Sequence, residues 1–148
     1  NAYRTGFEAS FETALTTDYY FKSEMAYVYA KNKDLDESLP LTPPLNARLI
    51  LGTTKEKYWA NVQYNITGSQ NEIAPSFGET STDGYQTIDV RLGFKPFKNA
   101  NLGFAVINVF DKTYNNHLNF SFNNQSNFTS TPITEPGRNI TAFFQYSF

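Results

Sequence analysis

Apolar and polar residues alternate with a period of two in seven segments of the chain. The clearest segment, residues 58–67, has its apolar positions at Tyr58, Ala60, Val62, Tyr64 and Ile66. Successive side chains of a β-strand point to opposite faces, so this period predicts strands with one apolar face and one mostly polar face. The predicted strands are residues 1–15, 19–30, 45–53, 58–67, 85–94, 101–110 and 137–148.

Short and long connections alternate between these strands. The short ones lie near residues 16–18, 55–57 and 96–100, and the long ones span residues 31–44, 68–84 and 111–136. Outer-membrane barrels have brief periplasmic turns, long external loops and strands of about ten residues that cross the bilayer at a tilt. The predicted fold class is therefore all-β: a segment of about seven strands from an antiparallel transmembrane β-barrel. A soluble antiparallel barrel or sandwich is the alternative.

An odd number of strands does not close this kind of barrel. In an up-and-down antiparallel sheet the first and seventh strands run in the same direction, and single-chain bacterial barrels have even strand numbers. We therefore interpret residues 1–148 as the C-terminal part of a larger barrel whose earlier strands lie outside this sequence. The sequence begins without Met or a signal-like segment, which fits this interpretation.

Aromatic residues are unusually frequent, because 10 Tyr, 14 Phe and 1 Trp make up 17% of the chain. Many of them lie beside the short turns, where a barrel carries a girdle of aromatic side chains at the membrane interface. The predicted girdle on the periplasmic side consists of Tyr19, Tyr20, Phe21, Tyr58, Trp59, Phe94, Phe97, Tyr146 and Phe148.

The rest of the composition mainly excludes functions. The net charge is −2 and the 12 Lys and Arg residues do not cluster, so a nucleic-acid-binding surface is not expected. Without Cys there is neither a disulfide nor a thiolate metal site. The longest apolar run, Met25 to Ala30, is too short for a transmembrane helix, so a membrane protein of this sequence must be a barrel.

Three stretches resemble one family. The segment NVFDKTYNNHL (Asn108 to Leu118), followed by EPGRN (Glu135 to Asn139) and a strand ending at Phe148, resembles the C-terminal signature of TonB-dependent outer-membrane receptors. The segment SLPLTPPLNARL (Ser38 to Leu49) is similar to a loop-to-strand segment found several strands before their end. The metal-chelate branch fits better than the SusC-like glycan importers, whose tail differs.

This resemblance implies a multi-pass protein of the outer membrane of a Gram-negative bacterium. It implies a 22-stranded barrel around an N-terminal plug domain, and the plug lies outside this sequence. The implied function is TonB-dependent import of a scarce solute, foremost an iron-siderophore or other metal complex. The implied partners are outer-membrane lipid, the protein's own plug, TonB, the barrel-assembly machinery and the metal-chelate ligand. A passive porin or an adhesin-type barrel is the alternative, because alternation alone does not separate a channel from a gated receptor.

Charged residues on the polar faces of the strands must face the interior of a lipid-spanning barrel. There they can pair across strands or contact the plug. These predicted interior residues are Glu8, Glu12, Lys22, Glu24, Arg48, Asp89 and Arg91.

Few residues indicate a binding site, and none indicates catalysis. His117 is the single histidine, and with Asn116 and Asn119 it is a weak candidate for ligand contact in an external loop; for His117, packing of that loop is the favoured role. Phe144, Tyr146 and Phe148 resemble the terminal signal that the barrel-assembly machinery reads.

Asp111 is expected to cap the turn that follows the sixth strand. Gly137 is expected to supply backbone freedom before the last strand. The chain has no Gly-x-Ser-x-Gly, no His-Glu-x-x-His and no phosphate-binding glycine loop, so we predict no catalytic residue, metal site or cofactor.

Overall fold

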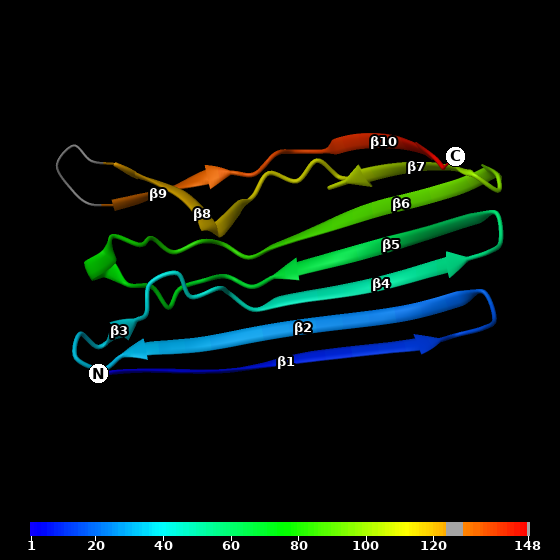
Figure 1. Ribbon diagram of the computed structural model, residues 1–148. Coiled ribbons are helices and arrows are strands. Elements are labelled where there is room, and N and C mark those ends of the chain that lie inside the picture. The colour runs from blue at the N-terminus through cyan, green and yellow to red at the C-terminus, as the bar shows by residue number, and fades with distance from the viewer. Residues whose placement is uncertain (124–128, 148) are drawn as a thin grey trace.

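Seven long strands lie side by side in one curved antiparallel sheet (Figure 1). The structure is a computed structural model and describes residues 1–123 and 129–147. Along the sheet the strands keep their order in the chain: β1 (Ala2–Ala14), β2 (Tyr19–Asn32), β4 (Asn46–Thr54), β5 (Tyr58–Thr67), β6 (Tyr85–Phe97), β7 (Ala100–Ile107) and β10 (Asn139–Tyr146). They correspond to the seven predicted strands, so the all-β antiparallel prediction is confirmed.

The long loops carry short elements that the sequence did not predict. β3 (Glu37–Ser38) pairs with the end of β2, and η1 (Pro75–Phe77) is a single turn of 3-10 helix. β8 (Asn115–Asn123) and β9 (Thr129–Thr134) form a separate two-stranded sheet. Figure 1 shows all of these at one end of the main sheet, opposite the short turns. Within the described residues, no helix has the length and apolar character needed to cross a membrane.

The strand register sorts side chains onto two different faces. On one face, called the apolar face below, Val62 lies opposite Val90, which in turn lies opposite Val106. On the other, called the polar face, Asn61 lies opposite Arg91. The period of two in the sequence therefore matches the observed pairing across the sheet.

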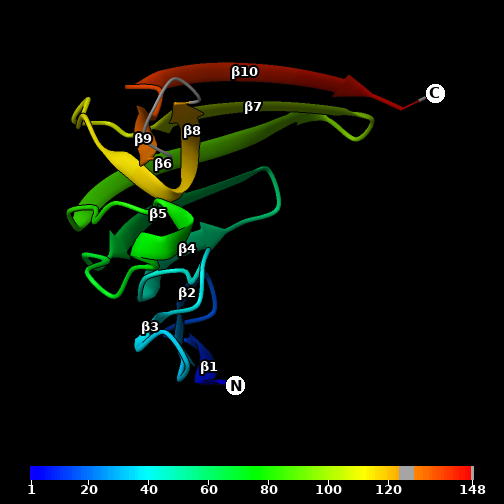
Figure 2. The same ribbon diagram turned by 90° about the vertical axis from the view of Figure 1, so that its left-hand side faces the viewer.

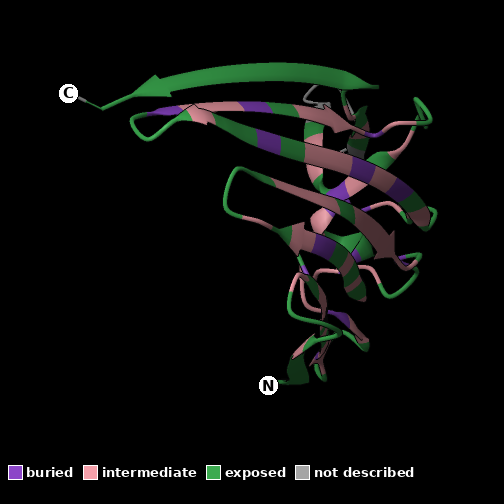
Figure 3. Cartoon of the chain, turned by 90° about the vertical axis from the view of Figure 1, so that its right-hand side faces the viewer, coloured by how far each residue is buried: buried purple, intermediate pink, exposed green. Residues whose placement is uncertain are grey.

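No second layer covers the apolar face in the described part of the chain. Among the described residues the buried apolar side chains are only Ala30, Ala74 and Ala100. On the apolar face Phe7, Leu51, Val62, Leu92 and Phe104 are exposed. Figure 3 shows long exposed stretches along the sheet. A sandwich would bury such a face against another sheet, and no described sheet lies against it.

The main sheet is open, with β1 and β10 as its two edges (Figure 2). All of β10 and all of β1 except Thr13 are exposed. Both edge strands run in the same direction in Figure 1. They cannot pair antiparallel with each other, which agrees with the prediction that the sheet is part of a larger barrel.

Three aromatic rings near the short turns lie on glycines of the neighbouring strand. A β-carbon at Gly52 would lie 2.3 Å from the ring of Tyr20, one at Gly93 would lie 2.3 Å from Trp59, and one at Gly103 would lie 2.1 Å from Phe143. Tyr20 lies opposite Gly52 and Trp59 opposite Gly93, and all three rings belong to the polar face. The assignment of Tyr20 and Trp59 to a lipid-facing girdle is therefore wrong. Phe148 lies outside the described residues.

Candidate functional site

All seven predicted interior residues lie on the polar face. The register pairs Glu12 with Lys22 and Glu24 with Arg48, and the ladders continue this face into β5 and β6. The predicted separation of charged residues from the apolar face therefore agrees with the pairing. The seven residues are Glu8, Glu12, Lys22, Glu24, Arg48, Asp89 and Arg91.

Glu24 is the centre of an ion-pair group on β2 and β4. Its Oε1 lies 2.7 Å from Nζ of Lys22, and its Oε2 accepts a hydrogen bond of 3.0 Å from Arg48. Glu8 and Glu12, on the neighbouring strand, make no side-chain hydrogen bond or ion pair with any described residue. A groove of about 590 Å³ runs over this region, and its polar lining includes Glu8, Glu24 and Arg48. The groove therefore presents the Glu8 carboxylate beside a group of one carboxylate and two cations.

Asp89 is the centre of a second group, and it is buried. Its Oδ1 accepts the backbone N–H of Asn108 at 2.9 Å, and its Oδ2 accepts from Arg91 at 3.1 Å and from Asn65 at 3.2 Å. Arg91 also donates to Gln63 at 3.1 Å. This carboxylate therefore joins β5, β6 and the turn after β7. Its hydrogen bonds are made within the sheet, which leaves Asp89 little capacity to hold another partner.

The loops at the far end of the sheet form a connected cluster. We call residues 33–45 the first long loop, residues 68–84 the second and the described residues 108–123 and 129–138 the third. The Glu79 carboxylate joins the first two, because Oε1 accepts the backbone N–H of Leu41 at 2.5 Å and Oε2 accepts that of Ala74 at 2.9 Å. Gln70 adds a bond of 2.8 Å to the carbonyl of Thr42. Glu79, Gln70 and Thr42 are all buried, so these contacts lie inside the cluster.

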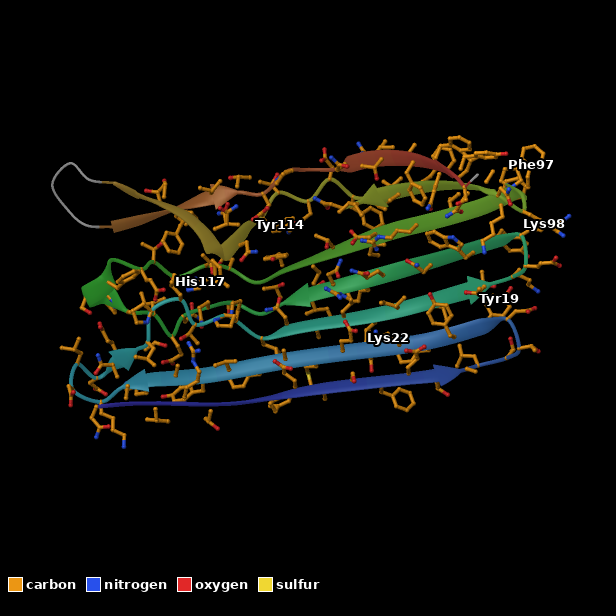
Figure 4. All side chains as sticks on the ribbon, viewed as in Figure 1. Tyr19, Lys22, Phe97, Lys98, Tyr114 and His117 are labelled. Carbon is orange, nitrogen blue, oxygen red and sulfur yellow. The ribbon has the colours of Figure 1, made fainter. Side chains whose placement is uncertain are left out.

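His117 joins the third loop to this cluster (Figure 4). The residue is 5% exposed, its Nδ1 lies 3.2 Å from Oγ1 of Thr82, and its Nε2 lies 3.9 Å from Oε1 of Glu79. Burial lowers the pKa of the His117 imidazole, and the nearby Glu79 carboxylate opposes this in part. The side chain therefore lies between loops and not on their outer surface.

The two asparagines that were predicted with His117 also hold the third loop. Oδ1 of Asn116 accepts the backbone N–H of Leu118 at 3.1 Å, and Nδ2 of Asn119 donates to Glu135 at 2.8 Å. The structure thus brings the three residues together on β8, and contact between them and a ligand stays a prediction.

No sequence pattern indicated a stacked tyrosine pair near the start of the third loop. The rings of Tyr85 and Tyr114 lie 4.0 Å apart at 27° to each other. Burial and the neighbouring Tyr85 raise the pKa of the Tyr114 hydroxyl. The pair joins the start of β6 to the third loop, and 28 intervening residues hide it from any local pattern.

Asp111 and Gly137 have other roles than the sequence predicted. Oδ1 of Asp111 accepts the backbone N–H of Arg138 at 2.7 Å, so it joins the two ends of the third loop and does not cap its own turn. That turn is held by Asn108, whose side chain bonds both the N–H and the carbonyl of Lys112. Gly137 has no left-handed backbone; a β-carbon there would lie 2.4 Å from Asp111. A larger residue at position 137 would therefore crowd the Asp111 carboxylate and disturb its hydrogen bond to Arg138.

The described residues contain no group of three or more His, Cys, Asp or Glu side chains placed to hold a metal ion. In the first loop Asp36 instead pairs with Lys31 at 2.8 Å, and this cation holds the pKa of the Asp36 carboxyl below its usual range.

Glu79, His117 and Thr82 lie in the order acid, imidazole and hydroxyl, as in a catalytic triad. Burial and the 3.9 Å gap at Nε2 make this row a packing contact between loops.

The final strand carries two of the three residues of the predicted assembly signal. Phe144 and Tyr146 are both exposed, and they lie on the apolar face opposite Leu102 and Ala100 of β7. Phe148 lies outside the described residues. Recognition by the barrel-assembly machinery stays a prediction.

Comparison with known proteins identifies the family. The model of the TonB dependent receptor-like β-barrel matches residues 1–109. The copper transporter OprC superposes on 99% of this chain with a TM-score of 0.90 and 27% identity. The ferric yersiniabactin uptake receptor FyuA from Yersinia pestis covers 99% with a TM-score of 0.77 and 17% identity. The open form of the ferric-catecholate import receptor Fiu from E. coli K12 covers 99% with a TM-score of 0.68 and 20% identity.

These matches also give the extent of the chain within such proteins. It spans 24% of the length of OprC, 24% of FyuA and 21% of Fiu. No curated protein sequence matches it. The open sheet is therefore the equivalent of about a quarter of each solved structure.

Proposed function

Because the chain belongs to the TonB-dependent receptor-like β-barrel family, we propose that it is the C-terminal part of an outer-membrane receptor that imports a scarce solute with energy supplied through TonB. The cargo we propose is a metal complex, with an iron-siderophore complex as the first candidate. The complete protein would be a 22-stranded barrel around its own plug domain.

The observation that carries the proposal is the separation of two faces on a sheet of this family. The apolar face exposes large side chains such as Phe7, Leu51 and Leu92, as lipid contact requires. The polar face carries the groups centred on Glu24 and Asp89, which suits an interior filled by water or a plug. This supports a multi-pass location in the outer membrane.

The polar face also supports contact with the plug at a particular region. No hydrogen bond or ion pair engages the Glu8 carboxylate within the described residues, and Glu8 lines the groove beside Arg48. Plug residues with complementary charge would fit there. Asp89 and Arg91 bond within the sheet, so we expect them to stabilise the barrel more than they hold the plug.

The choice of cargo is supported by the relative with the highest identity of the three compared. OprC is a copper transporter, which favours a metal-containing cargo. FyuA and Fiu are too distant to support more than the fold. The cluster of long loops would take part in capturing the solute at the outer surface, with His117, Asn116 and Asn119 among the candidate contacts. Phe144, Tyr146 and Phe148 would serve recognition by the barrel-assembly machinery.

Uptake measurements test this proposal. Cells that lack the full-length receptor, and the same cells with it restored, would be given labelled iron-siderophore complexes and, separately, labelled copper, with TonB present or deleted. We expect uptake of one of these metals to require both the receptor and TonB. Uptake that survives the loss of TonB would indicate a passive channel, and uptake of neither metal would contradict the proposed cargo.

A further inference from the structure

The contact between the second and third long loops contains a histidine, His117. If its imidazole were protonated, the added N–H would have no acceptor within hydrogen-bond distance. His117 is buried, and its Nδ1 already lies 3.2 Å from the hydroxyl of Thr82. Its Nε2 is buried without a hydrogen-bond partner. A neutral imidazole tolerates this arrangement at modest cost, whereas an imidazolium must place a second N–H and a full charge there.

Glu79 is the nearest carboxylate, but both of its oxygens are engaged. Oε1 accepts the backbone N–H of Leu41 and Oε2 accepts that of Ala74. The gap of 3.9 Å to His117 is about 1 Å longer than a charge-assisted hydrogen bond. To close it, the carboxylate would have to weaken its hold on the first loop. In this geometry the gap keeps Glu79 from serving as a full hydrogen-bond partner of a charged His117.

Within the described residues, no hydrogen bond or ion pair joins another titratable group to His117. Glu135 accepts a hydrogen bond from Asn119, and Tyr85 and Tyr114 are stacked on each other. Asp83 is exposed beyond Thr82. The titratable groups on the neighbouring elements are thus Glu79, Asp83, Tyr85, Tyr114 and Glu135.

We propose that His117 is a pH-sensitive joint: the neutral imidazole keeps the third long loop docked on the second, and protonation releases it. The inference deepens the proposed function, because these loops are the ones expected to capture the solute. Release would open the outer mouth and weaken capture in acidic surroundings. His117 acts here as a positioning residue and need not contact the solute.

The direction of the effect follows from linkage. Burial outweighs the Glu79 carboxylate, so the docked pKa of His117 lies below its ordinary value of 6.5. A histidine with a lowered pKa stabilises the docked state fully above the ordinary value, and this stability is lost as the pH falls toward the docked pKa. The ratio of released to docked loop therefore rises as the pH falls from about 7.5 to about 5.5, by at most roughly tenfold.

Hydrogen–deuterium exchange of the full-length receptor in detergent micelles tests the joint. After correction for the chemical exchange rate, we expect the peptide covering residues 115–121 to exchange faster at about pH 5.5 than at about pH 7.5, by at most roughly tenfold. A peptide from β5 serves as the internal reference and should not change. Equal corrected rates at the two pH values in the wild-type receptor would overturn the proposal.

Two variants assign the effect to the imidazole. His117→Gln removes the titrating group, so exchange of the third loop should lose its pH dependence. Thr82→Val removes the partner of Nδ1 but keeps the imidazole, so the dependence should persist even if docking weakens. A pH dependence that remains in His117→Gln would assign the effect to another group, such as Glu79, and would overturn the proposal.

These measurements need neither solute nor TonB, so they are independent of the uptake experiment. Absence of pH-dependent exchange together with TonB-dependent uptake would reject the joint alone. Release of the loop without any metal uptake would reject the proposed cargo and leave the joint in place.

Discussion

At the scale of single residues, the polar face shows a close fit between aromatic rings and glycines. The Trp59 ring lies where a side chain at Gly93 would be, and similar pairs form at Gly52 and Gly103. The sequence analysis did not predict these pairs, because nothing local indicates which ring lies across the ladder from a glycine. The register supplies that information, and it gives each glycine a steric reason.

Gly93→Ala tests this fit. The added β-carbon would lie 2.3 Å from Nε1 of Trp59, and a large ring in a packed position cannot move away at little cost. We expect the full-length receptor to lose about 1–3 kcal/mol of stability, measured as an earlier loss of the folded band when samples are heated before electrophoresis. Gly68→Ala is the control, because its nearest contact would be an ordinary 3.4 Å. Equal stability of the two variants would contradict the steric account.

At the scale of elements, the strands were predictable and the loop structures were not. Alternation determines which residues can form a strand with two unlike faces, and β5 follows it over its whole length. β8 escaped prediction because its sequence, NNHLNFSFN, is rich in Asn, which is rare in strands. The contacts of Glu79, Gln70 and His117 join residues 28 to 38 positions apart. Only the folded sheet brings such positions together, so no local pattern reveals them.

The end of β7 shows how one residue can set an element boundary. The sixth predicted strand continues to Phe110, but β7 ends at Ile107 because Asn108 adopts a left-handed backbone with φ of 53°. Its side chain then bonds both backbone groups of Lys112. Asparagine is among the few residues that accept this conformation readily.

Replacement of Asn108 separates its two contributions. Asn108→Ala loses both hydrogen bonds and strains the backbone, so we expect a loss of about 3 kcal/mol. Asn108→Gly loses the hydrogen bonds but relieves the strain, so the loss should be nearer 2 kcal/mol. Thermal unfolding of the full-length receptor measures both. If the glycine variant is the less stable of the two, the left-handed backbone is not what selects Asn108.

At the scale of the whole molecule, the sheet has two faces that need two different environments. Its apolar face has no packed partner in the described residues, and its polar face holds buried charge. A sheet with two such faces is not suited to bulk water on both of them. Its edge strands β1 and β10 each lack a neighbour on one side. Membership of the TonB-dependent receptor-like β-barrel family agrees with both the two unlike faces and the open edges. The central claim is that lipid covers one face and the barrel interior lies against the other.

The most direct test of that claim is nitroxide scanning along β5 of the full-length receptor in lipid bilayers. A spin label would be placed in turn at each position from residue 60 to residue 66, and its collisions with oxygen, which concentrates in lipid, would be measured. We expect high oxygen accessibility at residues 60, 62, 64 and 66 and low accessibility at residues 61, 63 and 65. Uniform accessibility, or a maximum at the odd-numbered positions, would contradict the account.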